Sequence, residues 1–180
     1  GPCAYFNEML LSSFPSVRIC NSDFDVRYDF PDIGEFDLVL CMEAIEHMKD
    51  LESPFPEEKF DAFTGSGIIS MLSGIKNILK KDGHLFISTP NTHCYRVLYN
   101  WINGQELFTY APHPRELSVR YMKSVIEPMY DILSVDYVDS WGCHNTPQEL
   151  IEKAERWLIE NNFDTNGRYE DNVFILCQKS

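Results

Sequence analysis

The stretch FDLVLCMEAIEHMKD, residues 36–50, begins as a continuous apolar run and ends in two carboxylates and an imidazole. The run at 36–41 is short and apolar at successive positions, which is typical of a strand buried on both faces of a parallel sheet. Glu43, Glu46 and His47 follow it within one turn of chain. The stretch therefore predicts a buried strand that ends in groups able to move protons or hold a cation.

Strand-like and helix-like segments alternate on both sides of this stretch. Apolar residues recur at helical spacing through 66–81, and Asp82 and the glycine after it end the pattern. Residues 92–112 are aromatic and irregular. The sequence further predicts helices at 4–13, from a Ser118 cap to 127 and from the TPQE capping box at 146–149, with strands at 16–20, 36–41, 84–89, 131–138 and 172–178. This alternation predicts an α/β fold in which helices lie on the faces of one sheet.

The bulk composition indicates one globular domain covering residues 1–180. The formal net charge is −13, from 28 acidic and 15 basic residues, which argues against nucleic acid as a partner. The six cysteines form no CxxC pair, so we expect buried free thiols in a reducing compartment. The sequence shows neither an apolar run of membrane-spanning length nor a signal-peptide pattern, so a cytoplasmic location is expected.

Polar side chains follow three of the predicted strands where each strand ends. Ligands of open α/β sheets bind beyond the carboxyl ends of the strands, so these clusters mark one candidate site. An acid after an early strand can accept hydrogen bonds from both hydroxyls of a ribose, and Asp23 and Asp25 stand in such a place. The alternative for Asp23 is a turn residue with local hydrogen bonds. The other two clusters are Glu43, Glu46 and His47 after 36–41, and Ser88, Thr89 and Asn91 after 84–89.

The cluster Glu43, Glu46 and His47 allows three interpretations. Two carboxylates and an imidazole suit a divalent cation. They also suit a general base, His47, that an acid orients. The third interpretation is structural, since acids are favourable at a helix N-terminus through the helix dipole.

Three sequence strings together resemble the class I S-adenosylmethionine-dependent methyltransferases. They are FDLVLCMEAIEHM at 36–48, LKKDGHLFISTPN at 79–91 and HPRELS at 113–118, in the family's order and at ordinary distances. The resemblance runs over essentially the whole chain. It implies a Rossmann-like sheet with helices on both faces, S-adenosylmethionine as cofactor, and an antiparallel strand pair formed by 131–138 and 172–178.

The start of the chain, GPCAYFNEMLLSSFP at 1–15, resembles the tail of the family's glycine-rich cofactor loop and the helix after it. The resemblance implies that Gly1 contacts the cofactor and that the first strand of the fold is missing from this sequence. Cys3 stands where a third glycine is expected. The alternative is that Gly1 and Pro2 remain from a cleaved tag.

The resemblance also implies roles for the candidate site residues. Asp23 would bind the cofactor ribose, with Asp25 as the second candidate, and Met42 and Glu43 would line the cofactor. Two related groups, the O-methyltransferases of ubiquinone synthesis and the 2′-O-methyltransferases of small RNAs, imply a Mg or Zn site in this kind of turn. Its ligands here would be Glu43, Glu46, His47 and His113.

We therefore expect a methyltransferase that acts on a small-molecule acceptor, at a hydroxyl oxygen, with His47 and Glu43 as catalytic residues. Residues 92–112 would form an acceptor lid, or else a loop packed on the sheet. The alternatives are a metal-dependent RNA 2′-O-methyltransferase, which the acidic charge disfavours, and a non-catalytic fragment that serves as a partner module. An exposed sheet centre would favour self-association, so a homodimer is one expected assembly.

Overall fold

The computed structural model describes residues 8, 11–13, 15, 24–30, 32–51, 65–105, 115, 117–139, 147–165 and 168–180. The predicted strand at 16–20 lies outside these residues, and the described part of the predicted helix 4–13 is helical. In chain order the elements are β1 (Phe36–Met42), the 3₁₀ turn η1 (Ile45–His47), α2 (Ser66–Ile78), β2 (Leu79–Pro90), α3 (Tyr95–Ile102), α4 (Val119–Ile126), β3 (Tyr130–Val138), α5 (Gln148–Glu160) and β4 (Asn172–Lys179).

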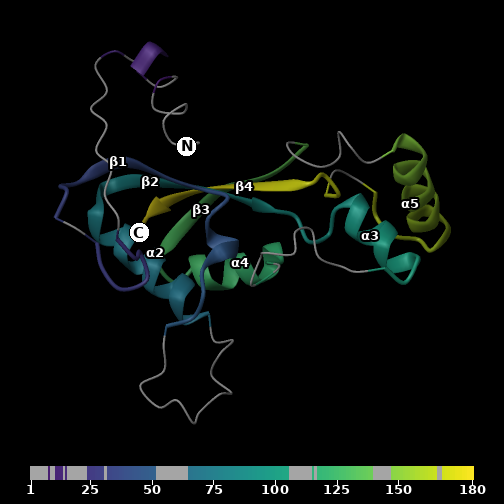
Figure 1. The fold of residues 1–180 in the computed structure, drawn as a ribbon, viewed down its shortest axis with the longest axis horizontal. Helices are drawn as coiled ribbons and strands as arrows, with labels where there is room; N and C mark the ends of the chain where they lie inside the picture. The colour runs from purple at the N-terminus through teal and green to yellow at the C-terminus, as the bar shows by residue number, and fades with distance from the viewer. Residues whose placement is uncertain are drawn as a thin grey trace, which may run out of the picture.

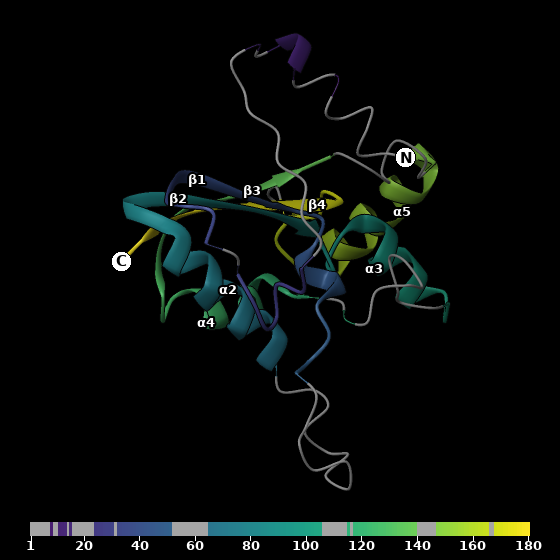
Figure 2. The ribbon, with the colours of Figure 1, turned by 60° about the vertical axis from the view of Figure 1, so that its left-hand side comes forward.

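The four strands of the described residues form one sheet in the order β1-β2-β4-β3. β1 and β2 run parallel, while β4 is antiparallel to both of its neighbours, β2 and β3. α2 and α4 lie together on one face of this sheet, and α3 and α5 pack on each other beyond the carboxyl end of β2 (Figures 1 and 2). The predicted α/β sheet with a closing antiparallel strand pair is therefore confirmed.

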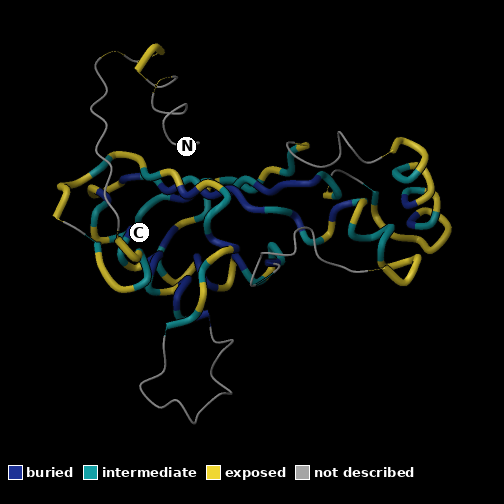
Figure 3. Tube along the Cα trace, in the orientation of Figure 1, coloured by how far each residue is buried: buried dark blue, intermediate teal, exposed yellow. Residues whose placement is uncertain are grey.

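The core lies between the sheet and its two covering helices, as the buried stretches in Figure 3 show. Leu72 of α2 and Met122 of α4 are fully buried against strand residues such as Leu85 and Ile175. The Tyr130 hydroxyl donates a hydrogen bond of 2.7 Å to the backbone oxygen of Leu72, which links β3 to α2 through the core. Burial of this apolar face is the main stabilising term of the domain.

The opposite face of β1 is apolar and open. Leu38, Leu40 and Met42 are 50%, 56% and 53% exposed, whereas Cys41 faces the core and is buried. Alternate residues of a strand point to opposite faces, so these three side chains share one side of the sheet. Within the described residues, the helical covering lies on the other side.

The boundary between α2 and β2 differs from the predicted one. The sequence pattern extends the helix to 81 and starts the strand at 84, but α2 ends at Ile78 and Leu79 already pairs with Phe36 of β1. The ladder then shifts register before His84, and Asp82 takes a positive φ of 61° within this irregular turn. Pairing with a neighbouring strand, a contact distant in sequence, overrode the local helical periodicity.

The predicted aromatic, irregular segment contains a helix, α3. Its Trp101 packs edge-to-face on Trp157 of α5, with ring centroids 6.1 Å apart. The predicted Ser118 cap of α4 is confirmed, because its side chain accepts a hydrogen bond from the backbone N–H of Tyr121. α5 begins at Gln148, and the predicted cap Thr146 lies outside the described residues.

Two further expectations concern the cysteines and the membrane. Cys41, Cys94 and Cys177 are buried free thiols, as predicted. Burial, with smaller contributions from the charges of Glu46 and Glu43, raises the pKa of Cys41 to about 12, so this thiol stays protonated at neutral pH. In the part of the chain that the structure describes, every helix is too short or too polar to cross a membrane.

Candidate functional site

Glu43 is the residue on which the ends of three strands converge. It follows β1 directly and takes a positive φ of 48°. Its backbone N–H donates to the backbone oxygen and to Oγ of Ser88, at 3.0 and 3.1 Å. Its carboxylate oxygen Oε1 accepts hydrogen bonds from Ser88 Oγ at 2.7 Å and from Asn172 Nδ2 at 2.9 Å. The carboxylate is thus held in one orientation at the carboxyl ends of the parallel strands β1 and β2.

Asn172 makes this arrangement rigid. Its side chain is fully buried at the start of β4, and its Oδ1 accepts a hydrogen bond of 2.8 Å from the backbone N–H of Val173. The amide orientation is therefore fixed, with Nδ2 directed at Glu43. The sequence analysis missed Asn172, which is 129 residues from Glu43 along the chain. The only local signal was a polar residue just before the apolar run of β4.

The turn η1 separates Glu46 from His47. Glu46 is 2% exposed and accepts a hydrogen bond of 3.2 Å from Thr89 Oγ1, whereas His47 is exposed. Successive residues of a 3₁₀ helix point about 120° apart, so one side chain enters the protein while the next faces outward. Glu46 and His47 are adjacent in sequence, but the first side chain lies in the protein interior and the second at the surface.

The predicted metal site is not supported by the arrangement of its described residues. Among the residues that the structure describes, no group of three or more His, Cys, Asp or Glu side chains is arranged to hold a metal ion, and this includes Glu43, Glu46 and His47. The physical reason is the 3₁₀ turn, which directs Glu46 toward Thr89 and His47 away from it. His113, the expected fourth ligand, lies outside the described residues.

The predicted cofactor residues are only partly described. Gly1 and Asp23 lie outside the described residues, and Met42 stands half-exposed at the end of β1. The carboxylate of Asp25 already accepts hydrogen bonds from the Arg27 side chain, at 2.9 Å from Nε to Oδ1 and 2.6 Å from Nη2 to Oδ2. A ribose bound at Asp25 would have to share this carboxylate with the guanidinium.

The Asp25–Arg27 pair gives a titration that can be measured. Hydrogen bonds from Arg27 lower the pKa of Asp25 from 3.8 to about 2. Since the folded pKa lies below the unfolded one, the contribution of the pair to stability is present above pH 3.8 and is lost as the pH falls through about 2. We expect the carboxyl carbon resonance of Asp25 to titrate near 2 in the folded protein, and nearer 3.8 in Arg27→Gln. An unchanged midpoint in the variant would show that Arg27 is not the cause.

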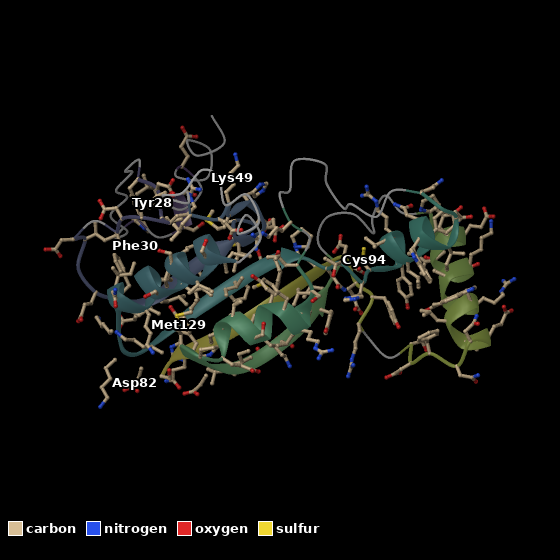
Figure 4. The ribbon with its side chains drawn as sticks, turned by 90° about the horizontal axis from the view of Figure 1, so that it is seen from below. Tyr28, Phe30, Lys49, Asp82, Cys94 and Met129 are labelled. Carbon is tan, nitrogen blue, oxygen red and sulfur yellow. The ribbon has the colours of Figure 1, made fainter. Side chains whose placement is uncertain are left out.

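The carboxyl end of β2 also carries Asn91, which the sequence analysis placed in the site cluster. Asn91 is 1% exposed, and its Nδ2 donates to the backbone oxygens of Arg168 and Glu170 at 3.0 and 2.8 Å. It ties the exit of β2 to the segment that enters β4. Cys94 marks where α3 then begins, at the far side of this junction (Figure 4). Asn91 therefore shapes the site without facing it.

A sequence profile described as a methyltransferase domain matches residues 12–158. Among curated proteins, the ubiquinone biosynthesis O-methyltransferase of Glaesserella parasuis serovar 5 (strain SH0165) is 35% identical over 74 residues, which cover 41% of this chain and 24% of that protein. The match thus spans about a quarter of the length of this relative.

Two solved structures have a similar fold. A SAM-dependent methyltransferase from Archaeoglobus fulgidus superposes with a TM-score of 0.51 at 16% identity, covering 96% of this chain and 72% of that one. The N-methyltransferase NodS from Bradyrhizobium japonicum WM9, solved with S-adenosyl-L-homocysteine, gives 0.50 at 10% identity, covering 97% and 61%. Identities this low bear on the fold alone. The profile covers most of the sequence, and the antiparallel pairing of β3 with β4 agrees with the strand pair that the resemblance implied, so the chain belongs to the methyltransferase domain family.

Proposed function

We propose that this domain transfers a methyl group from S-adenosylmethionine to a hydroxyl oxygen of a small-molecule acceptor. The observation that carries the proposal is the family match over residues 12–158, which includes β1 and β2, two of the three strands that meet at Glu43. The choice of oxygen is supported by the partial match to a protein named as an O-methyltransferase. The acidic charge of the chain supports a small acceptor over a nucleic acid.

The residues at the carboxyl ends of β1 and β2 suit the cofactor. When bound, S-adenosylmethionine would supply a methyl group attached to a positively charged sulfur. The sulfur is the leaving group when the methyl carbon is attacked in line. A fixed carboxylate such as that of Glu43 stabilises a nearby cation, because its hydrogen bonds to Ser88 and Asn172 keep it in place. Met42, half-exposed beside it, offers an apolar contact. We assign cofactor binding to this edge of the sheet.

His47 is the proposed general base. Its exposed side chain stands four residues after Glu43, at the outer side of η1. The imidazole of His47 would accept the proton of the acceptor hydroxyl as its oxygen takes the methyl group, and would then release that proton to solvent. The thioether product leaves uncharged. Alignment of the two reactants supplies most of the remaining rate enhancement.

The acceptor side would be closed by the segment 92–112, which we propose as a lid within a single domain of residues 1–180. Its described part is α3, which rests on α5 through Trp101 and Trp157. Both elements lie beyond the carboxyl end of β2, next to the edge assigned to the cofactor. Trp101 is 58% exposed and is available to an acceptor with an apolar or aromatic body.

The first test is calorimetric titration of S-adenosylhomocysteine into the chain. We expect one site with a dissociation constant in the micromolar range, and no heat from adenosine alone at the same concentration. Transfer of radiolabelled methyl from S-adenosylmethionine to a panel of catechols, sugars and amines then identifies the acceptor class. In His47→Gln we expect transfer to be lost while S-adenosylhomocysteine still binds. Absence of cofactor binding, or transfer to amines only, contradicts the proposal.

Removal of divalent cations is expected to leave cofactor affinity and methyl transfer unchanged. Glu46 lies buried against Thr89, and Oε1 of Glu43 already accepts two hydrogen bonds, so neither is arranged as a ready metal ligand. The measurement compares cofactor affinity and the rate of methyl transfer before and after dialysis against EDTA. A loss that added Mg²⁺ or Zn²⁺ restores would establish a metal-dependent enzyme instead.

A further inference from the structure

A basic cavity lies on the α4 side of the sheet, away from the Glu43 cluster. Its volume is about 950 Å³, and α4, β3 and the segments around His93 and Arg168 line it. Glu43, Ser88 and Asn172 are not among its lining residues. The side chains that define it are Arg120, Lys123 and Ser124 of α4, Tyr137 of β3, and His93 and Arg168.

The charge of this cavity is opposite to that of the whole chain. Three permanent cations, Arg120, Lys123 and Arg168, face one acid, Glu127, whereas the protein as a whole carries a net charge of −13. Like charges gathered around a hollow repel one another, so their presence costs stability unless an anion occupies the space. A concave cluster of this sign in an acidic protein therefore indicates an anionic ligand.

The walls of the cavity are held in place without a ligand. The buried Asn91 donates to the backbone oxygen of Arg168 at 3.0 Å, and its own Oδ1 accepts from the backbone N–H of His93 at 3.0 Å. Next to them, the backbone N–H of Tyr95 donates a hydrogen bond of 3.0 Å to the backbone oxygen of Tyr169. The rings of these two tyrosines stack with their centroids 5.1 Å apart. Two segments distant in sequence are thereby fixed as one surface, which lowers the ordering cost of binding.

We propose that this cavity binds the phosphate groups of a small phosphorylated molecule. Arginine guanidinium groups bind phosphate through paired N–H donors, and the hydroxyl of Tyr137 adds a neutral donor at the same wall. The three positive charges of Arg120, Lys123 and Arg168 exceed the single negative charge of Glu127, and their number suits the several negative charges of a diphosphate. The volume lies within the range of small-ligand pockets and leaves room for an organic group beside the phosphates.

The test is calorimetric titration of inorganic pyrophosphate at constant ionic strength. We expect saturable binding of pyrophosphate by the wild type. In the double variant Arg120→Gln/Lys123→Gln we expect the affinity to fall by about tenfold or more, because charge-assisted hydrogen bonds are lost. The matched control is Lys153→Gln/Arg156→Gln on α5, which removes the same charge at the same helical spacing outside this cavity. The control is expected to bind as the wild type does.

Four results would overturn the proposal. The first is no binding of pyrophosphate by the wild type, and the second is an equal loss in both double variants, which indicates unspecific charge attraction. The third is competition by S-adenosylhomocysteine, which would assign the cavity to the cofactor. A short single-stranded RNA that binds more tightly than pyrophosphate, through the same side chains, would replace the small molecule by a nucleic acid. Circular dichroism of both double variants confirms that the fold is intact.

Discussion

Glu43→Gln is expected to weaken binding of S-adenosylmethionine by about tenfold or more while it leaves binding of S-adenosylhomocysteine nearly unchanged. The two ligands differ in charge, since the first carries a sulfonium cation and the second a neutral thioether. Glutamine keeps an oxygen able to accept the hydrogen bonds from Ser88 and Asn172, so the fold around it persists. Only the negative charge is removed, and only the cationic ligand responds to it.

The measurement is a pair of calorimetric titrations on wild type and variant. Asp37→Asn is the matched control, because it removes the same charge from Asp37, which lies near the other end of β1, the strand that Glu43 follows, in an exposed ion pair with Lys80. An equal loss for both ligands would mean that Glu43 shapes the site and does not contact the sulfonium region. Unchanged affinity for both would remove Glu43 from the cofactor site.

Gly67→Ala is expected to lower the free energy of unfolding by about 2 kcal/mol, although alanine is the better helix former by roughly 1 kcal/mol. A Cβ on Gly67, in the first turn of α2, would overlap the backbone carbonyl oxygen of Lys49 and lie 2.9 Å from its carbonyl carbon. Figure 4 shows Lys49 at this end of the helix. The obstacle is backbone, which cannot rotate aside as a side chain can, so helix and turn must move apart.

Urea denaturation measures this effect, with Ser73→Ala as control in the same helix. Ser73 is exposed, so alanine there should stabilise the protein by a few tenths of a kcal/mol through propensity alone. The displaced turn also carries His47 two residues before Lys49, so we expect methyl transfer to fall further than cofactor affinity. A Gly67→Ala variant more stable than the wild type would show that α2 does not press on this turn.

The elements that the sequence predicted best are those whose signals are local. The strand 36–41 and the Ser118 cap depend on neighbouring residues, and both were found. The end of α2 was misplaced because Leu79 pairs with Phe36, and α3 was missed because its aromatic face is stabilised by Trp157. The end of α2 and the formation of α3 both depend on contacts between residues that are distant in the chain.

The candidate site shows the same division. Glu43 could be named from its place after an apolar strand, and its partner Ser88 belongs to a polar cluster that the strand pattern also marked. Asn172 could not be paired with Glu43, because nothing in one sequence links positions 129 residues apart. The predicted metal site finds no support among the described residues, where Glu46 is directed toward Thr89 and His47 is exposed.

The place of β4 in the sheet has a consequence for synthesis on the ribosome. β4 is the last of the described strands to be translated, yet it lies between β2 and β3 and pairs with both. Until it emerges, β2 pairs only with β1, β3 has no partner, and the edges of both strands that β4 will occupy stay open, which slows folding and favours chaperone capture. Asn172 begins this same strand, so the hydrogen bond that orients Glu43 forms only when the sheet closes. A truncated translation product that stops before β4 therefore carries the sequence motifs of the family without an assembled site.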